Sequence, residues 1–188
     1  VLIIGLVLFL GIHSVRIFAD DWRTAQIAKR GANGWKGLYT VVSIIGFVLL
    51  VWGFGMARQE THALWAVPKG MSHLASLLTW VSFVFLAAAY VPRNGIKARL
   101  HHPMVLGVKA LAHLLANNTV ADLVLFGSFL VWAVLSFRAA RGRDRTAGTV
   151  YPAGAFSATL IAVVVGTVAW AVFALWLHGP LIGVRPFG

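Results

Sequence analysis

The sequence predicts an all-α, polytopic integral membrane protein with about six transmembrane helices and both termini on the periplasmic side. The chain of 188 residues is 60% hydrophobic and only 11% charged, whereas a soluble domain carries roughly 25% charged residues. Its mean hydropathy is +0.84. Long apolar stretches alternate with short polar loops, and the positive charge gathers in alternate loops, which is the pattern of a membrane protein with a fixed orientation.

The first three expected helices are uninterrupted apolar runs. Residues 1–18 open with VLIIGLVLFL, which has neither the preceding basic segment nor the following A-x-A site of a signal peptide. Residues 37–56 follow a charged segment, 19–36, that we expect to be a loop. Residues 71–90 follow a second polar loop, 57–70. Each run falls within the length of about 17–25 residues that crosses a bilayer.

The fourth expected helix, residues 103–115, is short for a membrane span, because a helix of this length rises only about 20 Å and the hydrocarbon core is about 30 Å thick. Charge nevertheless supports it. With six spans, one side of the membrane carries twelve Lys and Arg residues and the other carries three. Without this helix the division becomes eight against seven. The positive-inside rule therefore favours six spans, with the short helix buried by its neighbours.

The last two expected helices are residues 121–137 and 156–176, and a strongly basic loop, 138–154, separates them. No internal repeat is present and the loops are too short for a second domain, so residues 1–188 are predicted to form one transmembrane domain. The net charge of +11 does not indicate a nucleic-acid partner, because the basic residues lie in loops between apolar spans. The expected surroundings are membrane lipid.

One stretch carries polar residues where a membrane helix should be apolar. On a helix through residues 102–117, His102, Lys109 and His113 would lie within about 20° of one direction, and Asn117 about 60° away. Polar groups at membrane depth are costly, so this stripe should face the protein interior. It is the main functional clue in the sequence.

The composition excludes several kinds of chemistry. The chain has no cysteine, which excludes disulfides and Cys-bound metals. Its five acidic residues lie in loops or at span ends, which argues against a carboxylate-driven proton carrier. It has no nucleotide-binding loop and no G-x-S-x-G sequence. The seven histidines remain as candidate metal or haem ligands.

The expected depth of each histidine in the membrane ranks it as a candidate haem ligand. His102 and His113 are about 16 Å apart on a helix and cannot both bind one iron. If His113 is an axial ligand, its partner comes from another span, with His13 the best buried candidate and His73 and His178 the alternatives.

Two basic residues accompany these histidines. Lys109 and Arg16 are placed to pair with haem propionates. These two side chains and His102 can also be explained without a cofactor. Lys109 would then extend along its helix to the membrane surface. Arg16 would anchor the chain at the inner membrane boundary, and His102 would be an interfacial side chain.

Three runs of the sequence are distinctive. The longest is HPMVLGVKALAHLLANNTVADLVLFGSFLVWAVLSFRAARGRDR, residues 102–145, and the others are GIHSVR at residues 11–16 and LHGPLIGVRPFG at the C-terminus. In these runs the sequence resembles the NnrU family of bacterial membrane proteins. The resemblance implies a multi-pass protein of the bacterial inner membrane, associated with denitrification near nitrite and nitric oxide reduction. Zeta-carotene isomerase looks like a distant relative that uses a b-type haem held by histidines. Carried over, the axial ligands fall on His13 and His113.

Three functions therefore stay open. The leading hypothesis is a protein that binds haem b through His13 and His113 and supports denitrification as a redox, sensing or maturation component. Lys109 and Arg16 would then meet the propionates, and His102 would be a supporting or exchangeable ligand. The alternative is a haem-dependent cis-trans isomerase of an apolar, carotenoid-like polyene. The third is a cofactor-free subunit or assembly factor, with a nitrogen-oxide reductase or other membrane subunit as partner.

Overall fold

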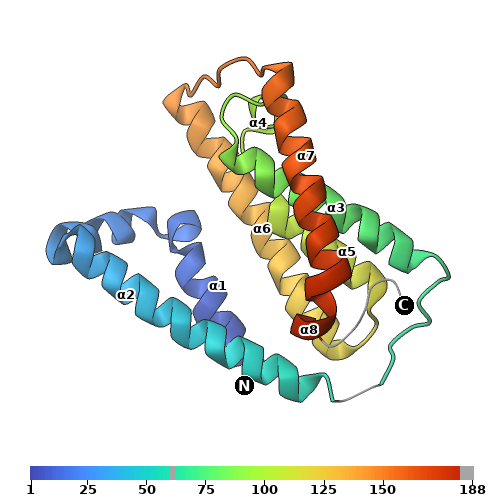
Figure 1. The fold of residues 1–188 in the computed structure, drawn as a ribbon. Helices are drawn as coiled ribbons and strands as arrows, with labels where there is room; N and C mark the ends of the chain where they lie inside the picture. Colours follow the sequence, from blue (N-terminus) through green and yellow to red (C-terminus); the bar gives the residue numbers. More distant parts are fainter. Residues whose placement is uncertain (60–61, 183–188) are drawn as a thin grey trace.

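The computed structural model describes residues 1–59 and 62–182, and within these ranges the regular structure is helical. Figure 1 shows the helices in chain order. Their bounds are α1 Leu2–Phe18, α2 Asp20–Ala57, α3 Met71–Tyr90, α4 Gly95–Leu100, α5 Val105–Ala116, α6 Val120–Ala147, α7 Phe156–Val172, the π-helical turn η1 Phe173–Leu177, and α8 His178–Ile182. The prediction of an all-α fold is confirmed for the described residues.

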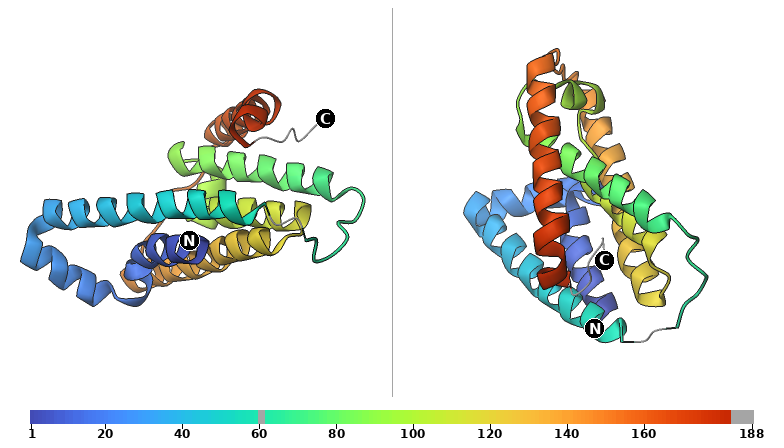
Figure 2. Two further views of the ribbon diagram at one scale, coloured as in Figure 1. Left: turned by 90° about the horizontal axis from the view of Figure 1, so that it is seen from below. Right: turned by 45° about the vertical axis from the view of Figure 1, so that its right-hand side comes forward.

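The helices pack in a spatial order that differs from their order in the chain. α1 and α2 form a hairpin that lies beside the other long helices (Figure 1). α1 packs against α6, α6 against α5, α5 against α3, and α3 against α7. Figure 2 shows α7 on the outside of α3, on the opposite side of the molecule from the hairpin. The short helix α5 is therefore covered by α3 and α6, as expected for a span too short to face lipid alone.

The protein is a helical membrane protein by the length and composition of its helices. Among the residues that the structure describes, four helices are long and apolar enough to cross a bilayer: Asp20–Ala57, Met71–Tyr90, Val120–Ala147 and Phe156–Pro180. Two shorter apolar helices cover Leu2–Phe18 and Leu106–Ala116. Many large apolar side chains on the long helices are exposed, such as Trp52, Val131 and Val168, which is expected of surfaces that face lipid. Six spans with periplasmic termini stay a prediction.

Two segments that we predicted to be loops are helical. The charged segment 19–36 belongs almost entirely to α2, which starts at Asp20 and is interrupted only at Gly31, where φ is 75° and ψ is 160°. α6 likewise continues past residue 137 to Ala147, through most of the basic loop. Arg, Ala and Gln are good helix formers, and Asp residues in the first turn of α2 complement the helix dipole. Charge in these segments marks the exit from the membrane and does not mark the end of a helix.

A buried asparagine fixes the connection after α3. The side chain of Asn94 is fully buried. Its Nδ2 donates to the carbonyls of Ala88 (2.8 Å) and Val91 (2.6 Å), and its Oδ1 accepts from the backbone N–H of Lys97 (2.8 Å). Asn94 thereby ends one segment and caps the next, α4. The same connection joins the end of α3 to the start of α7, because the backbone N–H of Gly95 donates to Thr159 Oγ1.

Candidate functional site

The polar stripe predicted from residue 102 onward does not form. α5 begins at Val105, so His102 lies in the turn before the helix. The reason is Pro103, whose ring disfavours the helical conformation of the preceding residue. Lys109 and His113 do lie one turn apart on α5, and Asn117 caps its end by donating from Nδ2 to the His113 carbonyl (2.8 Å). The polar face is therefore shorter than predicted.

His113 is held in one orientation by its own helix. Its Nδ1 lies 2.9 Å from the carbonyl oxygen of Lys109, one turn earlier. A carbonyl can only accept a hydrogen bond, so Nδ1 carries the proton and Nε2 keeps a free lone pair when the ring is neutral. The ring also packs against Phe126 of α6, with centroids 4.5 Å apart. Metal-bound histidines commonly have this arrangement, in which the second ring nitrogen donates to a carbonyl.

His113 lines a cavity of about 450 Å³ to which five parts of the chain contribute. Its lining includes the end of α2 and the beginning of α6, and these two helix ends lie towards the lower end of the molecule in Figure 1. The wall combines aromatic rings with polar side chains of both charges. The lining residues are Phe54, Arg58, Ser72, Ala75, Ser76, Thr79, Ala112, His113, Ala116, Asn117, Thr119, Asp122, Phe126, Trp170, Phe173, Ala174 and His178.

An irregular turn of helix forms one wall of this cavity. Residues Phe173–Leu177 adopt a π-helical turn between α7 and α8. Phe173 and Ala174 line the cavity, and so does His178, the residue that follows the turn. π-helical turns are rare in proteins, but those that occur are often found at functional sites. The turn brings a second histidine to the cavity that contains His113.

Lys109 has its own partners beside this cavity. Its Nζ lies 4.8 Å from the ring centroid of Phe173 and 5.4 Å from that of Phe83. These are cation–π distances. Lys109 is not among the residues that line the cavity. The cavity does contain another cation, Arg58, which the sequence alone gave no reason to select because it lies in the loop after the second expected span.

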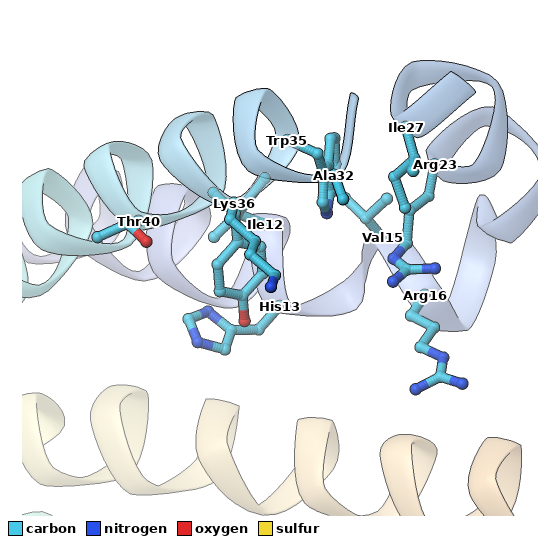
Figure 3. Close-up of a pocket in the computed structure, with 11 residues that line it drawn as sticks. Ile12, His13, Val15, Arg16, Arg23, Ile27, Ala32, Trp35, Lys36 and Thr40 are labelled. Carbon is cyan, nitrogen blue, oxygen red and sulfur yellow. The ribbon is translucent and has the colours of Figure 1, made fainter. Parts of the chain in front are cut away.

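His13 has the same local geometry as His113 but a different setting. Its Nδ1 lies 2.6 Å from the carbonyl oxygen of Phe9, one turn earlier on α1. Its ring packs against Phe9, Tyr39 and Trp132, with centroid distances of 4.3, 5.1 and 6.2 Å. The indole Nε1 of Trp132 is buried and has no hydrogen-bond partner among the described residues. His13 lines a second cavity, of about 440 Å³, together with Arg16 (Figure 3).

The structure does not bring His13 and His113 into one cavity. They contact α6 at Trp132 and Phe126 respectively, and six residues on a helix correspond to a rise of about 9 Å and a rotation of about 120°. The two rings therefore contact different parts of α6, and each lines a different cavity. The histidine that shares a cavity with His113 is His178.

His102 belongs to a third polar group, at the other end of α6. Its Nε2 lies 2.8 Å from Asp144 Oδ2, and the hydroxyl of Tyr151 donates to the same oxygen at 3.1 Å. The ring of His101 stacks on Tyr151 with centroids 4.1 Å apart, and Arg141 bonds to His101. Partial burial, with the nearby Asp144 carboxylate, raises the pKa of Tyr151. Sequence reasoning placed His102 at an interface but missed its partners, which are distant in the chain.

None of these groups resembles a metal site with several protein ligands. Among the described residues, no three His, Asp or Glu side chains are grouped so that they could hold a metal ion. A cofactor that needs one or two protein ligands is compatible with the histidines that are present, since haem iron takes its other ligands from the porphyrin.

Together these features define a helical membrane protein with a histidine-lined polar cavity among its helices. The model of one protein family, NnrU protein, matches residues 1–186. The chain therefore belongs to the NnrU family, as its resemblance predicted. Comparison with curated proteins and with solved structures gave no match.

Proposed function

We propose that this protein binds haem b in the bacterial inner membrane and supports denitrification as a redox, sensing or maturation component. His113 is the axial ligand in this proposal. The observation that carries it is the orientation of His113, whose Nδ1 donates to the Lys109 carbonyl while its ring lines a cavity of about 450 Å³. An imidazole fixed in this way keeps Nε2 available for iron.

The donors and the walls of the cavity fit a haem. Aromatic side chains, including Phe126 and Trp170, supply apolar surface for a macrocycle. Arg58 supplies a cation for a propionate, the role that we predicted for Lys109 and Arg16. The volume lies within the range of about 300–1,000 Å³ that is usual for ligand cavities. When bound, the haem would supply electron transfer or diatomic gas binding, and the protein would set its ligation.

Two residues compete for the second axial position. The resemblance favours His13, and the shared cavity favours His178. Two axial nitrogens must lie about 4 Å apart, since each bond to the metal is about 2 Å long. His13 and His113 line different cavities, whereas His178 and His113 line the same one. We favour His178 on this ground.

Optical spectroscopy tests the proposal. The full chain, produced in cells supplied with haem, is purified and its spectrum recorded oxidised and then reduced with dithionite. We expect a reduced b-type band that is lost in His113→Ala, is broadened or lost in His178→Ala, and persists in His13→Ala. The control is His73→Ala, since His73 is exposed on α3 and does not line the cavity.

The other outcomes are equally informative. Loss of the band in His13→Ala with retention in His178→Ala would restore the pair implied by the resemblance. A wild-type spectrum without any haem band would refute the proposal and leave the cofactor-free subunit, which pull-down against nitrogen-oxide reductase subunits then addresses.

A haem-dependent isomerase is the second candidate, and the aromatic lining of the cavity favours it. Flat rings such as Phe54 and Trp170 are suitable neighbours for an apolar polyene. Incubation of the haem-loaded protein with a cis-polyene, followed by chromatography of the isomers, tests this candidate. Unchanged isomer ratios would exclude this activity for the polyene used.

A further inference from the structure

We propose that the cavity between α1 and the bent part of α2 binds the phosphate headgroup of an acidic membrane lipid. This is the cavity of about 440 Å³ drawn in Figure 3, separate from the one that contains His113. The inference does not depend on the proposed function. Its lining residues are Ile12, His13, Val15, Arg16, Arg23, Ile27, Ala32, Trp35, Lys36, Tyr39 and Thr40.

The break in α2 creates the cavity. Gly31 adopts a positive φ of 75°, which a residue with a side chain rarely does. The chain before the break therefore turns back beside the end of α1. Trp22 and Trp35, one on each side of the break, pack edge to face with centroids 5.9 Å apart. Trp35 is only 5% exposed, so this packing holds the two parts of α2 together around the cavity.

The charge of the cavity points to an anion. Arg16, Arg23 and Lys36 all line it, and none of the eleven lining residues is acidic. Arg23 forms a long ion pair with Asp20 (3.5 Å), which lies outside the cavity and offsets part of one charge. In Figure 3, the side chains of Arg16 and Arg23 extend to the same side of the cavity. Guanidinium groups match phosphate oxygens, which they can bind with two parallel hydrogen bonds.

The remaining walls and the position of the cavity point to a lipid as the source of the phosphate. Ile12, Val15 and Ile27 supply apolar surface for the start of an acyl chain. The cavity lies where the apolar helix α1 ends and the charged part of α2 begins, next to two exposed aromatic residues, Phe18 and Trp22. Such a position is typical of the membrane interface. In the predicted six-span topology this position faces the cytoplasmic leaflet, whose acidic lipids attract basic groups.

Lipid binding by the purified full chain tests the proposal. Native mass spectrometry after equilibration with phosphatidylglycerol or phosphatidylcholine measures how much of each lipid stays bound. We expect preferential retention of phosphatidylglycerol and a fall of about thirtyfold in its affinity for the Arg23→Gln/Lys36→Gln double variant, since each basic residue near an acidic lipid surface contributes roughly fivefold. The charge-preserving variant Arg23→Lys/Lys36→Arg should keep most of the affinity.

A matched control removes two charges from the same segment without touching the cavity. Lys29 and Arg30 do not line it, and Arg30 Nε donates to Gln26. Lys29→Gln/Arg30→Gln should therefore bind phosphatidylglycerol as the wild type does. Equal retention of both lipids, or equal losses in the two double variants, would overturn the proposal.

A haem propionate offers the same anionic chemistry, so the haem spectrum is recorded on the same variants. A b-type band that persists in Arg23→Gln/Lys36→Gln while lipid affinity falls supports the lipid. A band that disappears while lipid affinity is unchanged assigns the cavity to propionates and overturns the lipid proposal. Failure of the haem proposal alone, with no band in the wild type, leaves the lipid measurement fully interpretable.

Discussion

Replacing Gly46 by alanine should separate α1 from α2. A Cβ atom at Gly46 would lie 2.6 Å from the backbone nitrogen of Phe9 and 2.9 Å from its Cα. Ordinary contacts of a Cβ begin at 3.4 Å. Because the opposing atoms are backbone, no side chain can turn aside, and α1 has to move by roughly 0.8 Å at this point. A gap of about 0.5–1 Å forfeits between a quarter and a half of the contact energy of the atoms beside it.

The expected cost follows from these distances. Overpacking of a tight interface costs about 1–3 kcal/mol, and alanine recovers about 0.5–1 kcal/mol of helix propensity relative to glycine. The difference lies between about 0 and 2.5 kcal/mol, and we expect Gly46→Ala to lower the free energy of unfolding by about 1 kcal/mol, the middle of this range. Gly53 makes a similar approach to Leu2 on the same face of α2, so the α1–α2 contact depends on glycine at both positions.

Unfolding in mixed micelles, followed by tryptophan fluorescence as denaturing detergent is added, measures this difference. Gly55→Ala on α2 and Gly11→Ala on α1 are the controls, because a Cβ at either position meets nothing within 4 Å. Both should be as stable as the wild type or slightly more stable. If Gly46→Ala unfolds at the same detergent fraction as Gly55→Ala, the conclusion that α1 packs closely on α2 at Gly46 is refuted.

Three further predictions concern other parts of the chain. Asp144→Asn should lower the pKa of Tyr151, because it removes a carboxylate that raises it; phenolate absorbance against pH, compared with Tyr151→Phe, measures the change. Asn94→Ala should destabilise the protein by about 2–4 kcal/mol, since it removes the side-chain partner of two carbonyls and one N–H that are buried or partly buried; the detergent titration measures this loss, and wild-type stability would mean that these hydrogen bonds contribute little. Because the chain lacks cysteine, a single introduced cysteine reports on which side of the membrane its position lies. With six spans, Ala66→Cys should react with an impermeant thiol reagent in intact cells, whereas Thr149→Cys should react only after lysis. Labelling of both variants in intact cells would contradict six spans.

The helices that sequence predicted best are those whose ends carry a local signal. The expected helix 71–90 has the same bounds as α3, Met71–Tyr90, because glycine precedes it and a proline-containing turn follows it. α6 starts within one residue of its predicted start, where Thr119 and Asp122 form a capping box. Such signals lie within a few residues and can be read without tertiary information.

The errors in the helix assignment share one cause. The charged residues of segments 19–36 and 138–147 indicated an exit from the membrane, and we equated that exit with the end of a helix. Hydropathy reports which solvent surrounds a segment, whereas the helix itself depends on backbone hydrogen bonds and propensity. The break that does occur in α2 is at Gly31, and glycine inside a helical segment is a weak signal because it is often tolerated.

The candidate site was predictable only in part for a related reason. His113 could be selected from its depth, and the structure gives it a cavity. Arg58, Asp122 and His178 join it from α2, α6 and the end of α7, and no local pattern connects these positions. The predicted stripe failed because one face of a helix requires one unbroken helix, and Pro103 interrupts it before His102 is reached.

The pairing of histidines depends on packing more than on local geometry. His13 and His113 both donate from Nδ1 to the carbonyl four residues earlier, so each presents the same free nitrogen and neither is the better ligand by this criterion. What distinguishes them is their neighbours, because they line different cavities and the π-helical turn brings His178 to the cavity of His113. A π-helical turn takes up one extra residue, so a regular α-helix of the same sequence would point His178 in a different direction. Inserting one alanine between Leu177 and His178 should therefore rotate His178 by about 100° and change the reduced haem spectrum as His178→Ala does. A normal spectrum in that insertion variant would remove the geometric case for His178 and favour His13.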